Sequence, residues 1–206
     1  MKPKCLAFDF DYTLASFSGN REALFEIFSS QGVPVTKVVT IYEEIKKAGA
    51  YSVANLVNRL MDETDTIFDV DKIYRDHDEW LRQNMRLYPD AERLKSKLDI
   101  PVAIITHGDE QHQKMKIDKT GILYDHLYIT PEADSKHKFL RELFDMLGGP
   151  IAFVDDKATE LDAVRDAGLT NEHVITHHIH RDDSRYGFLK AKHDHQIITG
   201  LEDLLK

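Results

Sequence analysis

Two aspartates, Asp9 and Asp11, directly follow a short apolar run at residues 5–8. The run lacks helical spacing, which is typical of a strand that is covered on both faces in a parallel sheet. Residues two apart in extended backbone point to the same side, so both carboxylates can reach one space. Like charges at that separation repel each other, and a hard cation such as Mg2+ would relieve the repulsion. Alone, the stretch indicates either a metal-dependent carboxylate site or two aspartates that cap a strand end.

Two later apolar runs, at residues 102–105 and 151–154, also end in polar residues. These residues are Thr106, His107 and Gly108 after the first run, and Asp155 and Asp156 after the second. Neighbouring parallel strands end at the same edge of a sheet, so the groups that follow them are expected to converge. A hydroxyl and backbone amides would then face an anion, while two further carboxylates would supply oxygen ligands.

A cation is expected at the same edge of the sheet. Lys136 and Lys138 stand at the start of a predicted helix, where backbone amides and an ammonium together favour a negative group. Each group has an ordinary alternative, since Thr106 can be a helix N-cap and either lysine can be simply solvated. The combination of two aspartate pairs, a threonine and a lysine across four strand ends favours a site.

Residues 88–206 alternate predicted helices with short apolar strands, which is the pattern of a parallel sheet with crossover helices. Strands are expected at residues 102–105, 127–130, 151–154, 174–179 and 197–198, and helices at residues 91–98, 110–119, 136–147, 159–167 and 200–205. The histidine-rich segment of residues 180–195 is expected to be a loop.

Helical periodicity replaces this alternation in the region that follows the first strand. Four helices are expected there: Pro34 opens the second, Ser52 is the N-cap of the third, and the fourth begins near Asp69. We therefore expect an α/β protein with a Rossmann-like parallel sheet core formed by residues 1–14 and 88–206. An all-helical domain of residues 15–87 would be inserted after the first strand.

Composition limits the partners and the compartment. The 206-residue chain carries a formal charge of −9, and nucleic-acid binding needs clustered Lys and Arg, so no nucleic-acid partner is expected. The single cysteine, Cys5, cannot form an internal disulfide, which fits a reducing compartment. Asp9 and Asp11 interrupt the first apolar run before it could serve as a signal peptide or a membrane span. We expect a cytoplasmic protein with no membrane span, and the sequence does not indicate the oligomeric state.

These motifs resemble the haloacid dehalogenase superfamily of phosphohydrolases over nearly the whole chain. Residues 9–14 resemble the family's first motif, Thr106 the second, Lys136 the third, and Asp155 with Asp156 the fourth. The predicted helical insert matches the position of the family's C1-type cap domain. The resemblance thus implies the same α/β core with an inserted cap.

Three positions depart from the family pattern. Tyr12 stands where glycine is most common, and His107 follows Thr106 where asparagine is frequent. No proline follows Lys136, so Lys138 competes with it for the role of the third motif's lysine. The change to Tyr12 removes no catalytic atom.

The resemblance implies a mechanism through an aspartyl-phosphate. Asp9 would be the nucleophile and Asp11 the general acid and base, with Thr106 and Lys136 as the other catalytic residues. Thr13 would order the turn. Substrate contacts are implied for Thr106, His107, Gly108, Lys136 and Arg21, with Phe17, Tyr51 and Arg59 as further candidates for the leaving group. Mg2+ contacts are implied for Asp9, Asp11 through its backbone carbonyl, Asp155 and Asp156.

Asp11 distinguishes the phosphohydrolases from the dehalogenases of the family, which attack carbon and lack an acid at this position. The linker from Thr106 through Gln113, Lys116 and Gly121 also resembles the branch that includes β-phosphoglucomutase and many small-metabolite phosphatases. The implied function is a Mg2+-dependent phosphatase of a small phosphorylated metabolite. Two alternatives stay open: a phosphomutase or phosphotransferase acting on a sugar phosphate, and a catalytically weak phosphate-binding regulatory protein.

Overall fold

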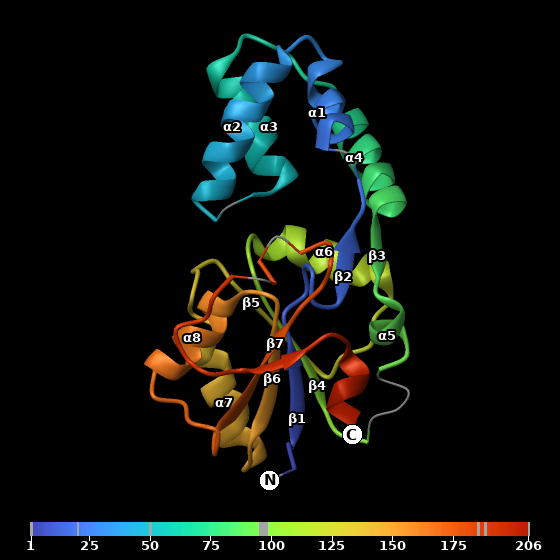
Figure 1. The fold of residues 1–206 in the computed structure, drawn as a ribbon. Coiled ribbons are helices and arrows are strands. Elements are labelled where there is room, and N and C mark those ends of the chain that lie inside the picture. Colours follow the sequence, from blue (N-terminus) through green and yellow to red (C-terminus); the bar gives the residue numbers. More distant parts are fainter. Residues whose placement is uncertain are drawn as a thin grey trace.

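The computed structural model describes residues 2–19, 21–49, 51–94, 99–184, 186–187 and 189–205. Six parallel strands form one sheet in the order β5-β4-β1-β6-β7-β8 (Figure 1). Their bounds are β1 Cys5–Phe8, β4 Val102–His107, β5 His126–Thr130, β6 Ile151–Asp155, β7 Val174–Ile179 and β8 Gln196–Ile198. The expected parallel α/β core is therefore confirmed.

The strand β1 lies in the middle of this sheet, between β4 and β6. Phe8 pairs with Ile104 on one side and with Val154 on the other. The Asp9 amide continues this pairing by donating a hydrogen bond to the Val154 carbonyl at 2.9 Å. Because the three strands are parallel and in this register, the residues that follow each of them enter one space.

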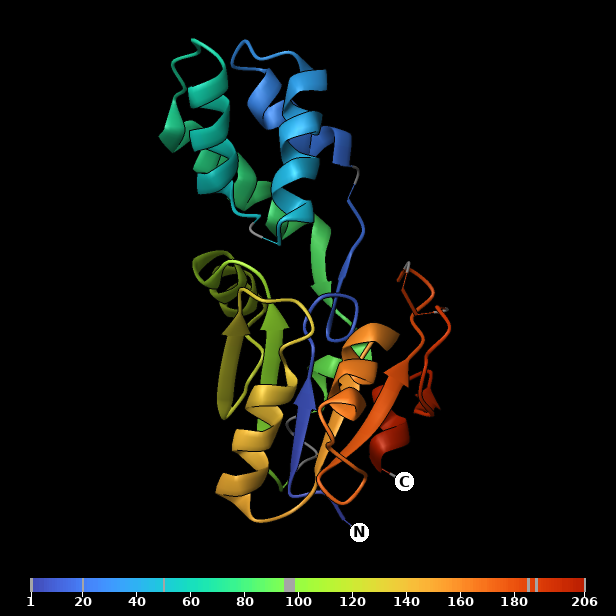
Figure 2. The same ribbon diagram turned by 90° about the vertical axis from the view of Figure 1, so that its left-hand side faces the viewer.

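Helices cover both faces of the sheet, which explains why β1 is apolar along its whole length. The core helices are α5 Pro89–Glu92, α6 Glu110–Thr120, α7 His137–Leu147 and α8 Ala158–Asp166, with the 3-10 helix η2 Leu201–Leu205 near the end of the chain. Ala7 packs in one core cluster with Leu140 of α7, whereas Phe8 packs in another with Ile117 of α6. Figure 2 shows α7 and α8 on the same side of the sheet.

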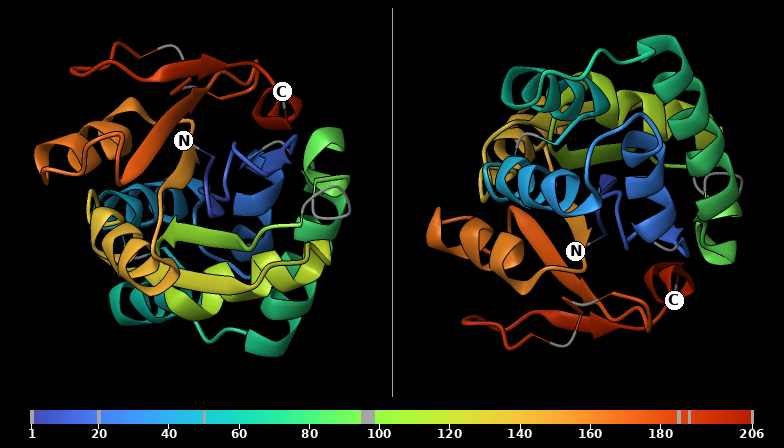
Figure 3. Two further views of the ribbon diagram at one scale, coloured as in Figure 1. Left: turned by 90° about the horizontal axis from the view of Figure 1, so that it is seen from below. Right: turned by 90° about the horizontal axis from the view of Figure 1, so that it is seen from above.

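Four helices form a lobe above the carboxyl ends of the strands (Figure 1). They are α1 Arg21–Ser29, α2 Val35–Lys47, α3 Val53–Glu63 and α4 Val70–Asn84. The expected N-cap is confirmed, because Ser52 Oγ accepts a hydrogen bond from the Asn55 amide at 3.2 Å. The fourth helix begins next to Asp69 as expected, and Asp69 Oδ1 accepts a hydrogen bond from the Lys72 amide at 2.9 Å. The lobe has its own hydrophobic cluster. Seen from above, these helices lie over the core and leave β8 uncovered (Figure 3).

The insert also contains two short strands, which the sequence did not indicate. β2 Ala15–Phe17 pairs antiparallel with β3 Met85–Leu87, so the outgoing and returning segments run side by side between the lobe and the core. Each strand has only three residues, too few to show the alternation by which a strand is recognised in a sequence. The proposed division of the chain into residues 1–14 with 88–206 and residues 15–87 places this ribbon in the insert.

Two expected boundaries differ in the structure. β4 continues to His107, because Thr106 and His107 pair with residues of β5. Thr106 is therefore a strand residue, and Asp109 is the N-cap of α6. The helix expected at residues 91–98 is represented by α5, which ends at Glu92, and residues 95–98 lie outside the described part of the chain.

None of the helices that the structure describes is long and apolar enough to cross a membrane.

A buried ion pair joins Arg181, in the segment after β7, to Asp90 of α5. Arg181 donates to both carboxylate oxygens of Asp90, at 2.9 and 3.0 Å, and to the Thr13 carbonyl at 3.0 Å. Its guanidinium carbon also lies 3.9 Å from the centre of the Tyr88 ring. Burial alone would raise the pKa of Asp90, but hydrogen bonds from Arg181 and the Leu201 amide outweigh it and lower that pKa.

Replacing this arginine should destabilise the fold. Arg181→Met leaves the Asp90 carboxylate buried without its cation, so we expect the free energy of unfolding to fall by about 3–5 kcal/mol in urea denaturation. Arg93→Met is the matched control, because Arg93 pairs with Glu202 in an exposed position, and it should cost less than about 1 kcal/mol. Equal losses in the two variants would contradict this assignment.

Candidate active site

Three buried carboxylates meet where β1 and β6 end. Asp9 follows β1, Asp155 ends β6, and Asp156 comes next in the chain. Each offers an oxygen, and these oxygens all lie within 4.8 Å of one another. The three residues are 6%, 0% and 2% exposed, so the cluster is held by the core rather than by the solvent-exposed surface. The expected convergence of strand ends is therefore present.

A buried lysine neutralises part of this charge. Lys136 Nζ donates to Asp9 Oδ1 at 2.6 Å and to Asp155 Oδ2 at 2.7 Å. Its side chain is 2% exposed, whereas the side chain of Lys138 is 60% exposed and pairs with Glu132. Of the two candidate lysines, the structure thus brings Lys136 into the site.

The protonation of the cluster is governed by burial and by its excess of negative charge. Burial raises the pKa of Asp9 to about 6, although the charge of Lys136 opposes this shift. Burial and then the charge of Asp155 raise the pKa of Asp156 to about 8. Burial alone would lower the pKa of Lys136, but the charges of Asp155 and Asp9 outweigh it and raise that pKa. The raised pKa values of Asp9 and Asp156 indicate that one bonded ammonium does not balance all three carboxylates in their ionised forms.

This donor set fits a hard divalent cation. Mg2+ prefers oxygen ligands and is commonly held by one or two carboxylates together with other oxygen atoms. A cation bound between Asp9, Asp155 and Asp156 would favour their ionised forms and offset their mutual repulsion. Asp11 is not one of the three clustered carboxylates, so its expected contribution through the backbone carbonyl remains a proposal.

Asp156 is held in place by residues from distant parts of the chain. Ser184 Oγ donates to Asp156 Oδ2, and His178 Nε2 donates to the Asp156 carbonyl at 3.0 Å. The Asp156 amide donates to Thr13 Oγ1 at 3.2 Å, which agrees with the expectation that Thr13 orders the turn. Sequence reasoning assigned no role to Ser184 or His178, because nothing local marks the loop and strand that carry them as neighbours of Asp156.

The end of β4 supplies the expected threonine beside the carboxylates, but one backbone amide that follows it is already hydrogen-bonded within the protein. Thr106 is 1% exposed and lines the same cavity as Asp9. The Gly108 amide already donates to the Thr130 carbonyl at 2.9 Å, so the anion contact expected of this amide is not supported. Gly108 instead has a φ of 145° that favours glycine.

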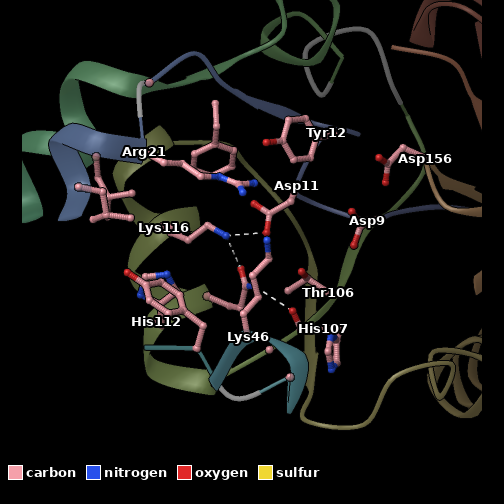
Figure 4. A pocket seen from close by; sticks show the side chains of 18 of the residues that line it. Asp9, Asp11, Tyr12, Arg21, Lys46, Thr106, His107, His112, Lys116 and Asp156 are labelled. Carbon is pink, nitrogen blue, oxygen red and sulfur yellow. Dashed lines mark hydrogen bonds and ion pairs between the residues drawn. The ribbon is translucent and has the colours of Figure 1, made fainter. Parts of the chain in front are cut away.

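His107 is close to the insert. A Cβ added to Gly49 would lie 2.9 Å from His107 Nε2, which shows how near the loop after α2 comes to this ring. Burial, and then the charges of Lys157 and Lys136, lower the pKa of His107, so the neutral ring is favoured at neutral pH. In Figure 4 the ring points away from Asp9, and its expected substrate contact remains a proposal.

Tyr12 occupies a backbone conformation that explains the family's preference for glycine. Its φ is 60°, in the left-handed region that most residues avoid and glycine adopts readily. The Tyr12 amide donates to the Ala15 carbonyl at 2.7 Å and closes the turn after Asp11. The tyrosine ring lies 5.9 Å from the ring of Phe17, and both rings line the cavity.

The cavity lies between the core and the insert and has a volume of about 330 Å3. Arg21, at the start of α1, reaches from the insert toward Asp11 (Figure 4). Phe17 and Tyr51, two of the other expected leaving-group contacts, also line it. The fourth candidate, Arg59, is not among the lining residues and instead pairs with Glu44 and Glu63 on the exposed side of the lobe, so that expectation is wrong.

The comparison with family models identifies the class of protein that has this fold and this carboxylate cluster. The model of the haloacid dehalogenase-like hydrolases matches residues 3–168. The chain therefore belongs to the haloacid dehalogenase-like hydrolase family. A search among curated proteins found no match to this chain.

Solved structures of low sequence identity share the fold. A haloacid dehalogenase-like family protein from Streptococcus pneumoniae is 19% identical over 99% of this chain and 98% of its own, with a TM-score of 0.58. An L-2-haloacid dehalogenase is 18% identical over 98% and 97%, with a TM-score of 0.64. A variant of a family enzyme from Bacteroides thetaiotaomicron, in complex with magnesium and inorganic phosphate, is 12% identical over 91% and 100%, with a TM-score of 0.61.

Lys136 and Lys138 should contribute differently to stability, because the Lys136 side chain is buried and the Lys138 side chain is exposed. Lys136→Met leaves Asp9 and Asp155 buried without their ammonium, so the free energy of unfolding measured with chelator present should fall by about 3–5 kcal/mol. Lys138→Met removes an exposed pair and should cost less than about 1 kcal/mol. A larger loss in Lys138→Met than in Lys136→Met would show that the lysine assignment is wrong.

Proposed function

We propose that the protein is a Mg2+-dependent phosphatase that hydrolyses a small phosphorylated metabolite through an aspartyl-phosphate on Asp9. The observation that carries this proposal is the clustering of Asp9, Asp155 and Asp156 within 4.8 Å beside Lys136. A phosphate monoester is itself negative, so a carboxylate can attack it only where cations offset the repulsion. Displacement of a halide from carbon places no such charge on the reacting atom, and it gives no reason to collect three carboxylates.

Each residue then has a defined part in the reaction. The Asp9 carboxylate attacks phosphorus, the bond from phosphorus to the leaving oxygen breaks, and Asp11 gives that oxygen a proton. Water then attacks the phosphorus of the aspartyl-phosphate, and Asp11 takes a proton from the water. The bond to Asp9 breaks and inorganic phosphate is released. Thr106 and Lys136 would hold phosphoryl oxygens during both steps.

The metal would be held by side-chain oxygens of Asp9 and Asp155 and by the backbone carbonyl of Asp11. Asp156 would add an oxygen directly or through a bound water. When bound, Mg2+ would neutralise charge on the phosphoryl group and on Asp9. The residues already described fit this role because they are oxygen donors with uncompensated negative charge.

The substrate is proposed to be small because the lobe of α1–α4 covers the reacting groups. A cavity of about 330 Å3 is within the range of small-molecule sites. Arg21 supports a polar or negative group on the leaving side of the substrate. The formal charge of −9 makes nucleic acid an unsuitable partner, and a single, buried cysteine, Cys5, fits a reducing compartment such as the cytoplasm.

The proposal is tested with p-nitrophenyl phosphate. The wild-type protein should release p-nitrophenol and phosphate when Mg2+ is present, and a chelator should abolish this activity reversibly. Asp9→Asn removes the nucleophile, so kcat should fall by at least about a thousandfold. Asp145→Asn, an exposed aspartate of α7, should leave kcat unchanged. Activity that persists in Asp9→Asn would rule out the covalent mechanism.

The same assay, extended to a panel of phosphorylated sugars, nucleotides and small acids, separates the alternatives. Isomerisation of a sugar phosphate without release of phosphate would assign a phosphomutase. Phosphate binding with no turnover of any ester would assign a regulatory protein. Hydrolysis of one class of ester well above the others would identify the substrate class.

A further inference from the structure

Lys116 is a buried cation that the mechanism above does not use. It lies in α6 and is 4% exposed. Its Nζ donates to Asp11 Oδ2 at 2.6 Å, and it lies 5.6 Å from the centre of the Phe10 ring and 5.0 Å from that of Phe17. A carboxylate and two aromatic faces therefore fix the position of this ammonium.

A second contact connects Lys116 to the end of β4. Lys116 Nζ also donates to Gln113 Oε1 at 3.0 Å, and Gln113 Nε2 donates to the His107 carbonyl at 2.8 Å. The amide is packed so closely that a Cβ on Gly108 would lie 2.7 Å from Gln113 Nε2. Asp11 is thus connected by side-chain hydrogen bonds to the backbone beside the proposed phosphate site (Figure 4).

The helix α6 also contacts the insert. One turn before Lys116, the His112 ring packs at 5.1 Å against Tyr51 and at 5.7 Å against His77, which both belong to the insert. One turn after Lys116, Lys119 forms an ion pair with Asp78 of α4. The helix α6 therefore bonds Asp11 through Lys116 and also contacts the lobe through His112 and Lys119.

Asp11 needs such support because its own surroundings do not fix it. Its side chain is 32% exposed, and the residue lies just before a turn rather than inside one of the strands of the sheet. Proton transfer requires the carboxyl oxygen to stay within about 2.6–3.2 Å of the reacting oxygen. The second oxygen, Oδ1, is buried and accepts no hydrogen bond from any described residue, so it is the oxygen left for contact with a reacting group.

We propose that Lys116 is a positioning residue, which holds Asp11 by one carboxylate oxygen so that the other exchanges a proton with the leaving group and then with water. This inference rests on the proposed phosphatase function and deepens it. Lys116 itself forms no bond to the substrate. Its contribution is to the orientation of Asp11, and it is coupled through α6 to the docking of the insert.

A positioning role predicts that the loss depends on the leaving group. p-Nitrophenolate leaves without a proton, whereas the alkoxide of an aliphatic phosphate ester needs one from Asp11. For Lys116→Met we expect kcat/KM to fall by roughly 10- to 100-fold with an aliphatic ester that the wild type hydrolyses, such as glycerol 2-phosphate. With p-nitrophenyl phosphate the fall should be less than about threefold. A lysine that only stabilised the fold would lower both values equally.

Three further variants sharpen this test. Lys114→Met is the matched control, because Lys114 lies in the same helix and pairs with Asp118 at an exposed position, and it should change neither value. Lys116→Gln repeats the loss of charge with a polar side chain, in case Lys116→Met does not fold. In Asp11→Asn, adding Lys116→Met should cost almost nothing further, since the residue it positions has already lost its function.

The outcomes separate the two proposals. Equal losses with both esters, or a full additional loss in the Asp11→Asn background, would overturn the positioning role while leaving the phosphatase intact. If the wild type with Mg2+ hydrolysed no phosphate ester, both proposals would fall together. The expected pattern is an ester-dependent loss that disappears when Asp11 is replaced.

Discussion

The contact of Lys136 with Asp9 and Asp155 is the interaction on which the rest of the site depends. Charges buried in a protein core are costly unless they are paired and hydrogen-bonded, and an unpaired partner is strongly destabilising. Here one ammonium is shared by carboxylates from β1 and β6, at 2.6 and 2.7 Å. This contact fixes the start of α7 to the carboxyl edge of the sheet. The remaining negative charge then makes the edge a place for a divalent cation.

The insert and the core each contribute residues to the cavity. The core supplies the groups proposed to react, and the lobe of α1–α4 supplies aromatic and cationic side chains that line the cavity. The helix α6 belongs to the core but contacts both parts, through Lys116 toward Asp11 and through His112 and Lys119 toward the lobe. The residue proposed to position Asp11 and two residues that contact the lobe therefore lie in one helix.

Much of this arrangement could be predicted from the sequence, because continuous apolar runs mark buried parallel strands and polar residues mark their ends. Asp9, Thr106 and Asp155 were found in this way, and Lys136 came from the start of a helix. Other features depend on contacts between distant residues, which no local pattern reveals. Lys116 meets Asp11 across 105 positions, and Arg59, expected near the leaving group, pairs with acidic neighbours instead.

The central claim is that Asp9 becomes covalently phosphorylated. The most direct measurement is a rapid acid quench of the wild-type protein during turnover of p-nitrophenyl phosphate with Mg2+, followed by mass spectrometry of its peptides. The mechanism requires a phosphoryl group on Asp9 that disappears when the substrate is exhausted. Release of phosphate with no adduct at any time after mixing, or with an adduct on another residue, would contradict it.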